Sequence, residues 1–158
     1  KAIAQLIFGE YSPSGKLPVT VYSSTNDLPD FNDYSMANRT YRYFKGTPEF
    51  PFGYGLSYTE FHYGELEKEA CDGKLKVSVT VKNIGNFDGK EVVRLFKSEK
   101  NAINQPLKSL ARFKKISLAR GEERTVDFVL TDEDFTHINE NGEKEYLSAD
   151  NFDIFIEE

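Results

Sequence analysis

The stretch that decides the fold is KLKVSVTVK, which runs from Lys74 to Lys82. Polar and apolar residues alternate along it without a break, and one face carries Leu75, Val77, Val79 and Val81. A period of two is the pattern of a β-strand that has one face in a hydrophobic core and the other in water. This segment therefore predicts a half-buried strand.

Four further segments carry strand patterns, and they lie at residues 91–96, 107–118, 125–130 and 152–156. Turn residues separate them, including Asn83 to Gly89 and the Asn-Gly pair at positions 141 and 142. Short strands spaced by about ten residues, with no helix between them, are typical of a β-sandwich. We predict a mostly β fold over residues 65–158.

Residues 1–64 have a different sequence pattern. Ala2 to Phe8 has helical spacing and ends at Gly9, and Leu17 to Tyr22 is a short strand candidate. Residues 23–63 have no periodicity and contain three of the six prolines, yet they are rich in Tyr and Phe. We predict an ordered, irregular segment that wraps a neighbouring surface with aromatic anchors.

Composition restricts the class of protein. Hydrophobic residues make up 39% of the 158 residues, which is the composition of a globular chain. The net charge is −6 and no basic face stands out, so we expect no nucleic-acid partner. No apolar run has the length of a membrane helix, so we expect no membrane partner. Cys71 is the only cysteine, which excludes an internal disulfide and a thiolate metal cluster.

Acid pairs are the first candidates for chemistry, because two neighbouring carboxyl groups with different pKa values can act as general acid and general base. Each pair in this sequence lies in a polar loop or at a terminus, where a raised pKa is hardest to obtain. We interpret them as solvated surface groups and assign no catalytic residue. The pairs are Asp30 with Asp33, Asp132 with Asp134, and Glu157 with Glu158.

Other motifs carry little chemistry. His62 and His137 have no nucleophile or metal-spaced partner, so we expect surface residues. Gly9 to Lys16 has the wrong spacing for a phosphate loop, and Leu17 stands where Ser or Thr is required. The acidic stretches near residues 132–134 and 139–142 lack the spacing of a calcium loop. We assign no metal and no cofactor.

Several blocks resemble family-three glycoside hydrolases, the β-glucosidase and β-xylosidase group. The block YSPSGKLPVT, residues 11–20, is similar to a family motif that usually has Asn where Ser12 stands. RTYRYF at residues 39–44 and PFGYGLSYTEF at residues 51–61 are similar to the next two blocks. Residues 79–93 and 110–122 resemble the fibronectin type III-like domain of this family.

The resemblance implies a fold and a position in a larger enzyme. It implies an immunoglobulin/fibronectin type III-like β-sandwich at residues 65–158, preceded at residues 1–64 by the tail of an α/β sandwich domain and a linker. In such enzymes the nucleophilic Asp and the acid/base Glu lie upstream, so we expect this segment to be inactive alone. The sequence departs from the family at Arg94, Leu95 and Phe96, where Gln-Leu-Tyr is commoner, and it stops soon after Ile156.

The expected role is that of a non-catalytic, stabilising module in a β-glycosidase. The partners would be the catalytic domains of the parent enzyme and, in the full enzyme, a β-linked oligosaccharide. By family resemblance the location would be periplasmic or secreted. The alternative is a free-standing β-sandwich module that binds carbohydrate or protein.

Aromatic residues 41–61 have two interpretations. Their rings could stack on sugars, or they could staple two domains together, with Arg39 and Arg42 packed on rings. We favour the staple. The rings belong to Tyr41, Tyr43, Phe44, Phe50, Phe52, Tyr54, Tyr58 and Phe61.

The first residues lead to one more expectation. If Ala2 to Phe8 evolved to pack inside an α/β domain, its apolar side needs another cover in this chain. We expect that side to fold back on the sandwich or to associate with a second copy of the chain.

Overall fold

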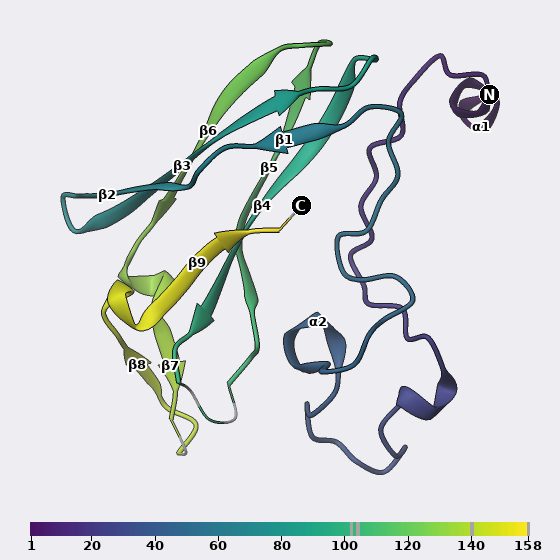
Figure 1. Cartoon of the computed structure of the whole chain (residues 1–158). Helices are drawn as coiled ribbons and strands as arrows, with labels where there is room; N and C mark the ends of the chain where they lie inside the picture. The colour runs from purple at the N-terminus through teal and green to yellow at the C-terminus, as the bar shows by residue number, and fades with distance from the viewer. Residues whose placement is uncertain (102, 104, 140, 158) are drawn as a thin grey trace.

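The computed structural model describes residues 1–101, 103, 105–139 and 141–157. Figure 1 shows two parts side by side: a β-sandwich, and an extended segment that runs beside it. We call residues 10–60 the strap. The short helix α1 (Ala2–Ile7) lies at the start of the strap, away from the sandwich.

The first sheet is built around β3 (Lys74–Asn83), the strand that the alternating pattern predicts. β6 (Glu123–Leu130) pairs with one edge of β3. β1 (Phe61–Tyr63) and β2 (Glu67–Cys71) share the other edge, each opposite a different part of β3. All these pairings are antiparallel, and every residue of β2 is exposed.

The second sheet has β4 (Gly89–Glu99) between β5 (Ser109–Leu118) and β9 (Phe152–Ile156). The β4–β5 register shifts between Leu95 and Phe96, so that Ala111 is an extra residue on β5. This shift is a β-bulge, and it interrupts the ladder of hydrogen bonds at that point.

Shorter elements complete the chain. β7 (Thr136–Ile138) and β8 (Lys144–Tyr146) form the hairpin that the Asn-Gly signal predicts, although position 140 of its turn lies outside the described residues. The strap contains the helix α2 (Thr40–Tyr43). One-turn 3-10 helices cover Thr25–Asp27, Asp132–Asp134 and Ala149–Asn151.

The hydrophobic core lies between the two sheets. The predicted face of β3 supplies Val77, Val79 and Val81, all at most 2% exposed. The predicted β-sandwich is confirmed, because each strand with an alternating pattern places its apolar residues in this core. The other sandwich residues in the core are Val93, Leu95, Ile116, Leu118, Val126, Phe128, Leu130, Phe135, Phe152 and Ile154.

The expected strand at residues 17–22 is wrong. Only Val21 forms an isolated bridge, to Phe50. The backbone of Leu17 also exchanges hydrogen bonds with the stretch from Gly53 to Tyr54. Between these two contacts Pro18 has no N–H to donate, so the paired segments do not form a regular ladder.

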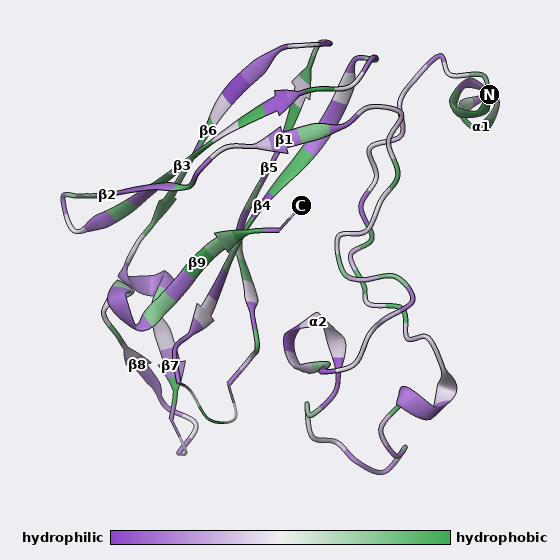
Figure 2. Ribbon diagram, viewed as in Figure 1, coloured by the Kyte–Doolittle hydropathy of each residue, from purple (hydrophilic) through white to green (hydrophobic). Residues whose placement is uncertain are grey.

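The expected helix near the N-terminus is confirmed, but its apolar side does not fold back on the sandwich. Ile3, Ile7 and Phe8 are 75%, 71% and 82% exposed. Figure 2 shows strongly hydrophobic residues on this helix, well away from the sheets. A contact with a distant part of the strap helps to fix the helix: the Tyr58 hydroxyl donates to the carbonyl of Leu6 at 2.7 Å.

Asn83 closes one end of the sandwich and is completely buried. Its amide nitrogen donates to the carbonyls of Phe87 at 2.8 Å and Leu118 at 3.2 Å. Its amide oxygen accepts from the Thr59 hydroxyl at 2.5 Å and from the N–H of Gly85 at 3.1 Å. One side chain therefore joins the strap, both sheets and the β3–β4 turn.

We predict that Asn83→Ala destabilises the chain by about 3 kcal/mol, because several buried polar groups lose their partner together. Urea unfolding followed by circular dichroism measures the loss. Asn86→Ala is the matched control in the same turn, where the side chain is exposed, and it should change the stability by less than about 0.5 kcal/mol. Equal effects of the two substitutions would contradict the role of Asn83.

Candidate docking interface

The strap covers the outer face of the second sheet. Val93 and Leu95 point into the core, so the alternate residues Arg94 and Phe96 point outward. Both are nevertheless buried: Phe96 is 0% exposed and Arg94 is 5% exposed. The strap must therefore exclude water from this face.

Phe96 is the centre of an aromatic cluster. The rings of Tyr41 and Phe52 stack on each other at 4.1 Å and meet Phe96 edge-on at 6.1 Å and 6.2 Å. Phe155 of β9 stacks on Phe96 at 5.9 Å. Edge-on and offset arrangements of this kind are favourable contacts between aromatic rings. Two strap residues thus pack on a sheet residue that lies outside the central core.

The side chain of Arg94 holds the strap by a hydrogen bond to the main chain of the strap. Its guanidinium donates to the carbonyl of Phe52 at 3.3 Å and to that of Glu157 at 3.2 Å. Gly53 lies directly over it, with φ +84°, and a β-carbon at Gly53 would fall 1.0 Å from Nη1 of Arg94. Position 53 therefore requires glycine for two reasons, its left-handed backbone and the absence of space.

The β-bulge is used as an attachment point. The N–H of Leu110 donates to the Tyr41 hydroxyl at 3.1 Å, at the place where the ladder is interrupted. The N–H of Leu107 donates to the carbonyl of Arg42 at 2.6 Å. The strap thus satisfies backbone groups that the bulge and the β4–β5 loop leave free.

A buried ion pair joins the first part of the strap to β4. The ammonium group of Lys16 lies 3.3 Å from the carboxylate of Glu91, and the two side chains are only 18% and 7% exposed. Gly55 packs against the same stretch, because a β-carbon there would lie 2.1 Å from the carbonyl oxygen of Gly15. The two runs of the strap are therefore in direct contact beside the sheet.

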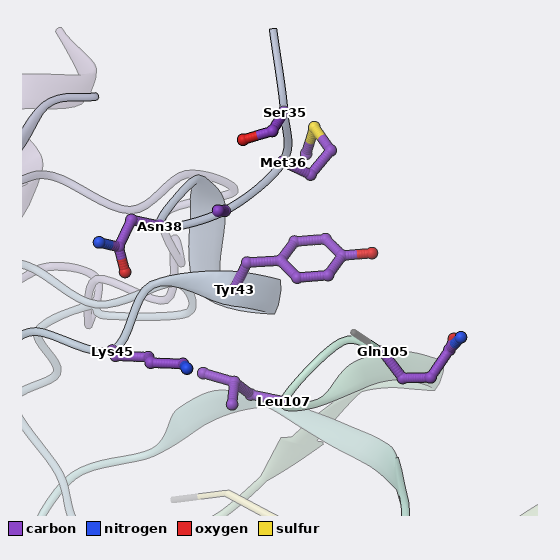
Figure 3. Close-up of a pocket in the computed structure, with 8 residues that line it drawn as sticks. Ser35, Met36, Asn38, Tyr43, Lys45, Gln105 and Leu107 are labelled. Carbon is purple, nitrogen blue, oxygen red and sulfur yellow. The ribbon is translucent and has the colours of Figure 1, made fainter. Parts of the chain in front are cut away.

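Most rings of the aromatic segment pack against the strap or the sandwich, as the staple interpretation predicts. Phe44 packs edge-on against Tyr22 at 4.8 Å within the strap, and Phe61 packs against the sandwich core. Phe50 and Tyr54 pair at 4.9 Å but remain more than a third exposed. Tyr43 behaves differently, since its ring projects into a surface hollow (Figure 3).

The strap also has an outward side that nothing in the described structure covers. Large apolar side chains are exposed along it, and Phe31 and Tyr34 reach 90% and 89%. Large apolar side chains that a folded segment leaves exposed are characteristic of an interaction site. The other exposed apolar residues of the strap include Val19, Leu28, Met36 and Leu56.

The acid pairs do not form a centre suited to acid catalysis. Asp30 and Asp33 lie in an exposed turn, where the backbone N–H of Ser35 and then its hydroxyl lower the pKa of Asp33. In the second pair, burial disfavours ionisation of Asp134, but hydrogen bonds from Arg112 and the Thr131 N–H outweigh it and lower the pKa. Position 158 of the third pair lies outside the described residues.

In the described part of the chain, neither histidine is hydrogen-bonded to a serine, threonine or cysteine side chain. His62 is exposed on β1. The expectation for His137 needs correction, because its Nδ1 lies 3.0 Å from the carboxylate of Glu99 and its side chain is only 25% exposed. It joins β7 to β4. Among the described residues, no three His, Cys, Asp or Glu side chains are grouped to hold a metal, and no helix has the length and hydropathy to cross a membrane.

The described residues form a β-sandwich that carries a stapled aromatic strap, with exposed apolar side chains on the strap and on helix α1. Two family models match the chain: the glycosyl hydrolase family 3 C-terminal domain at residues 1–58 and the fibronectin type III-like domain at residues 91–158. The chain belongs to glycoside hydrolase family 3 and corresponds to the C-terminal region of its members.

Relatives with known names agree with this assignment. The chain is 46% identical over 134 residues to a xylan 1,4-beta-xylosidase of Xylanibacter ruminicola, a match that covers 84% of the chain and 15% of the relative. It is 36% identical over 173 residues to thermostable beta-glucosidase B of Acetivibrio thermocellus, covering 98% of the chain and 23% of the relative. The chain thus spans less than a quarter of these two relatives.

Solved structures contain the same fold. A beta-D-glucoside glucohydrolase from Trichoderma reesei matches with a TM-score of 0.84 and 26% identity, over 98% of this chain and 26% of that one. A beta-glucosidase from Kluyveromyces marxianus matches with a TM-score of 0.82 and 32% identity, over 99% and 22% of the two chains. Both matches include the strap as well as the sandwich.

We predict that Gly53→Ala displaces the strap. The left-handed backbone costs about 1–2 kcal/mol with a side chain, and the overlap with Arg94 adds about 1–3 kcal/mol. Urea unfolding measures the loss, and limited trypsin digestion at Arg39 and Arg42 should become faster. Gly73→Ala is the matched control, since Gly73 has φ +71° with nothing within 4 Å of a β-carbon. A loss no larger than that of Gly73→Ala would contradict the contact.

Asp134 gives a prediction for pH. Both of its oxygens accept from Arg112, at 2.6 Å and 2.7 Å, and its side chain is 13% exposed. Asp134→Asn should lower the stability at pH 7 by about 1–2 kcal/mol, a value reduced because Arg112 is 40% exposed.

The pH dependence follows from the lowered pKa of Asp134. A depressed pKa in the folded state stabilises above the unfolded value of about 4, and this contribution is lost as the pH falls through the folded value. The stabilities of the wild-type chain and of Asp134→Asn should therefore converge in acid. Glu133→Gln, where the side chain is 67% exposed, is the control. A difference that stays constant from pH 7 to pH 2 would rule out this origin.

Proposed function

We propose that this chain is the non-catalytic C-terminal module of a β-glycosidase, and that it docks on the catalytic domains and stiffens them. The observation that carries the proposal is the two-sided strap. One side is stapled to the sandwich by Arg94, Tyr41 and Lys16, while the other side presents ordered, exposed apolar residues.

The upstream part of the parent enzyme is the partner that suits this outward side. The relatives named above contain several times the length of the matched region. Helix α1 adds the exposed side chains of Ile3, Ile7 and Phe8, and burying such side chains stabilises by about 1.5–3 kcal/mol each. In the separate chain, a second copy can cover α1 instead, which makes self-association the expected behaviour.

The parent activity would be hydrolysis of O-glycosyl bonds in β-linked glucosides or xylosides, as the names of the relatives indicate. One relative is a periplasmic beta-glucosidase of Salmonella typhimurium, 34% identical over 172 residues. We therefore extend the proposal to a periplasmic or secreted location.

The test of the non-catalytic role is an assay of the purified chain on aryl β-glucosides and aryl β-xylosides. We expect no turnover, because the described carboxyl groups of the acid pairs are exposed or bound in ion pairs. The full-length Xylanibacter ruminicola xylosidase serves as the active control. Turnover that survives repurification of the chain would overturn the proposal.

The docking part is tested with the separately produced upstream portion of the same xylosidase. We expect saturable binding in a sedimentation or calorimetric titration, weakened at least about tenfold by Phe31→Ser combined with Ile3→Ser. Val129→Ser removes a 48% exposed apolar side chain from the sandwich and is the matched control. Binding that is unchanged by the strap substitutions, or lost equally in Val129→Ser, would contradict docking through the strap.

A further inference from the structure

A hollow of about 590 Å³ lies between the strap and the loop that joins β4 to β5 (Figure 3). Residues 35–45 form one wall, and Gln105 and Leu107 form the other. The volume falls in the range of sites for small molecules, about 300–1,000 Å³. We propose that this hollow binds a short, neutral oligosaccharide, a role that goes beyond bracing the catalytic domains.

The apolar part of the hollow is suited to the face of a sugar ring. Figure 3 shows the ring of Tyr43 projecting across the hollow, with Met36 on one side and Leu107 on the other. The C–H groups of a β-linked pyranose give each ring face an apolar patch, and an aromatic ring offers a flat surface of matching size. The Arg42 guanidinium carbon lies over the Tyr43 ring, 5.8 Å from its centroid, so Tyr43 is the stacking residue through its other ring face.

The polar part of the hollow is suited to hydroxyl groups. The side-chain amide of Asn38 and the ammonium group of Lys45 have no hydrogen-bond or ion-pair partner in the described part of the chain. Gln105 uses its amide nitrogen for the carbonyl of Ile138, at 3.0 Å, and keeps its amide oxygen as an acceptor. Amides offer both donors and acceptors, as a sugar hydroxyl requires.

The charges in the hollow exclude a cation as the ligand. Lys45 is the charged residue among those that line it, and the described lining contains no carboxylate. A metal ion or a basic peptide would meet a positive charge and no anionic partner. A neutral polyhydroxylated molecule needs no charged partner, and the ammonium group of Lys45 can donate to its oxygens.

Both walls are held in place before any ligand binds. The N–H of Leu107 donates to the carbonyl of Arg42 at 2.6 Å, which ties the loop to the strap. The Tyr22 hydroxyl donates to the carbonyl of Asn38 at 3.0 Å, and Nε of Arg39 donates to the carbonyl of Ser35 at 2.9 Å. A preformed site loses little conformational entropy on binding, so even a modest set of contacts gives measurable affinity.

The experiment is an NMR titration of the isotope-labelled 158-residue chain with xylotetraose and, separately, cellotetraose. We expect saturable shifts confined to residues around the hollow for at least one of the two sugars. Tyr43→Ala should weaken binding at least about tenfold, while Tyr43→Phe keeps the ring and should stay within about threefold of the wild type. Tyr54→Ala removes another exposed strap ring and should leave binding unchanged.

A second variant separates binding from folding. Asn38 has φ +56°, so Asn38→Asp keeps a residue that tolerates this backbone and removes the two amide donors. It should weaken binding severalfold with an unchanged thermal midpoint. Shifts that do not saturate, or equal losses in Tyr43→Ala and Tyr54→Ala, would overturn the proposal. Either result would leave the docking proposal intact, since the hollow takes no part in that test.

Discussion

The buried guanidinium group of Arg94, between the strap and the second sheet, is the constraint on which the rest of this structure depends. Removing a charge from water costs free energy, and hydrogen bonds to the carbonyls of Phe52 and Glu157 offset part of that cost, while Nε of Arg94 has no hydrogen-bond partner among the described residues. These carbonyls belong to the strap and to the segment after β9, which are distant from Arg94 in sequence. The side chain therefore makes the order of the strap and the order of the final strand depend on each other.

Alternation of apolar residues was enough to predict the sandwich, because each strand needs only its own sequence to show which face is buried. The same argument failed at Leu17 to Tyr22, where Pro18 prevents a regular ladder despite the apolar residues around it. It also gave no information on Asn83, which reads as a turn residue although it is completely buried. Its partners come from the strap, the β3–β4 turn and β5, and periodicity reports only on neighbours in the sequence.

The sequence predicted that the strap packs on a neighbouring surface, but it did not predict which side chains make the contact. Aromatic residues without periodicity indicated a segment that wraps a surface, and Tyr41 and Phe52 do so. The departure from the family pattern at Arg94 to Phe96 gave no sign that these side chains form the surface being wrapped. The sequence of a strand that is buried on both faces does not reveal what covers each face. The packing of the strap on the outer face of β4 is therefore seen only in the structure. The hollow at Tyr43 arises in the same way from two segments that no local pattern connects.

Strand β2 has a consequence for the behaviour of the molecule in a crowded solution. It lies at the border of the first sheet, all of its residues are exposed, and it carries Glu67, Lys68 and Glu69 in succession. An unpaired backbone border can recruit strands from other molecules and so begin aggregation, whereas closely spaced charges of both signs make such recruitment unfavourable. The charged border of the first sheet thus opposes polymerisation of a chain that exposes apolar side chains elsewhere, on the strap and on helix α1.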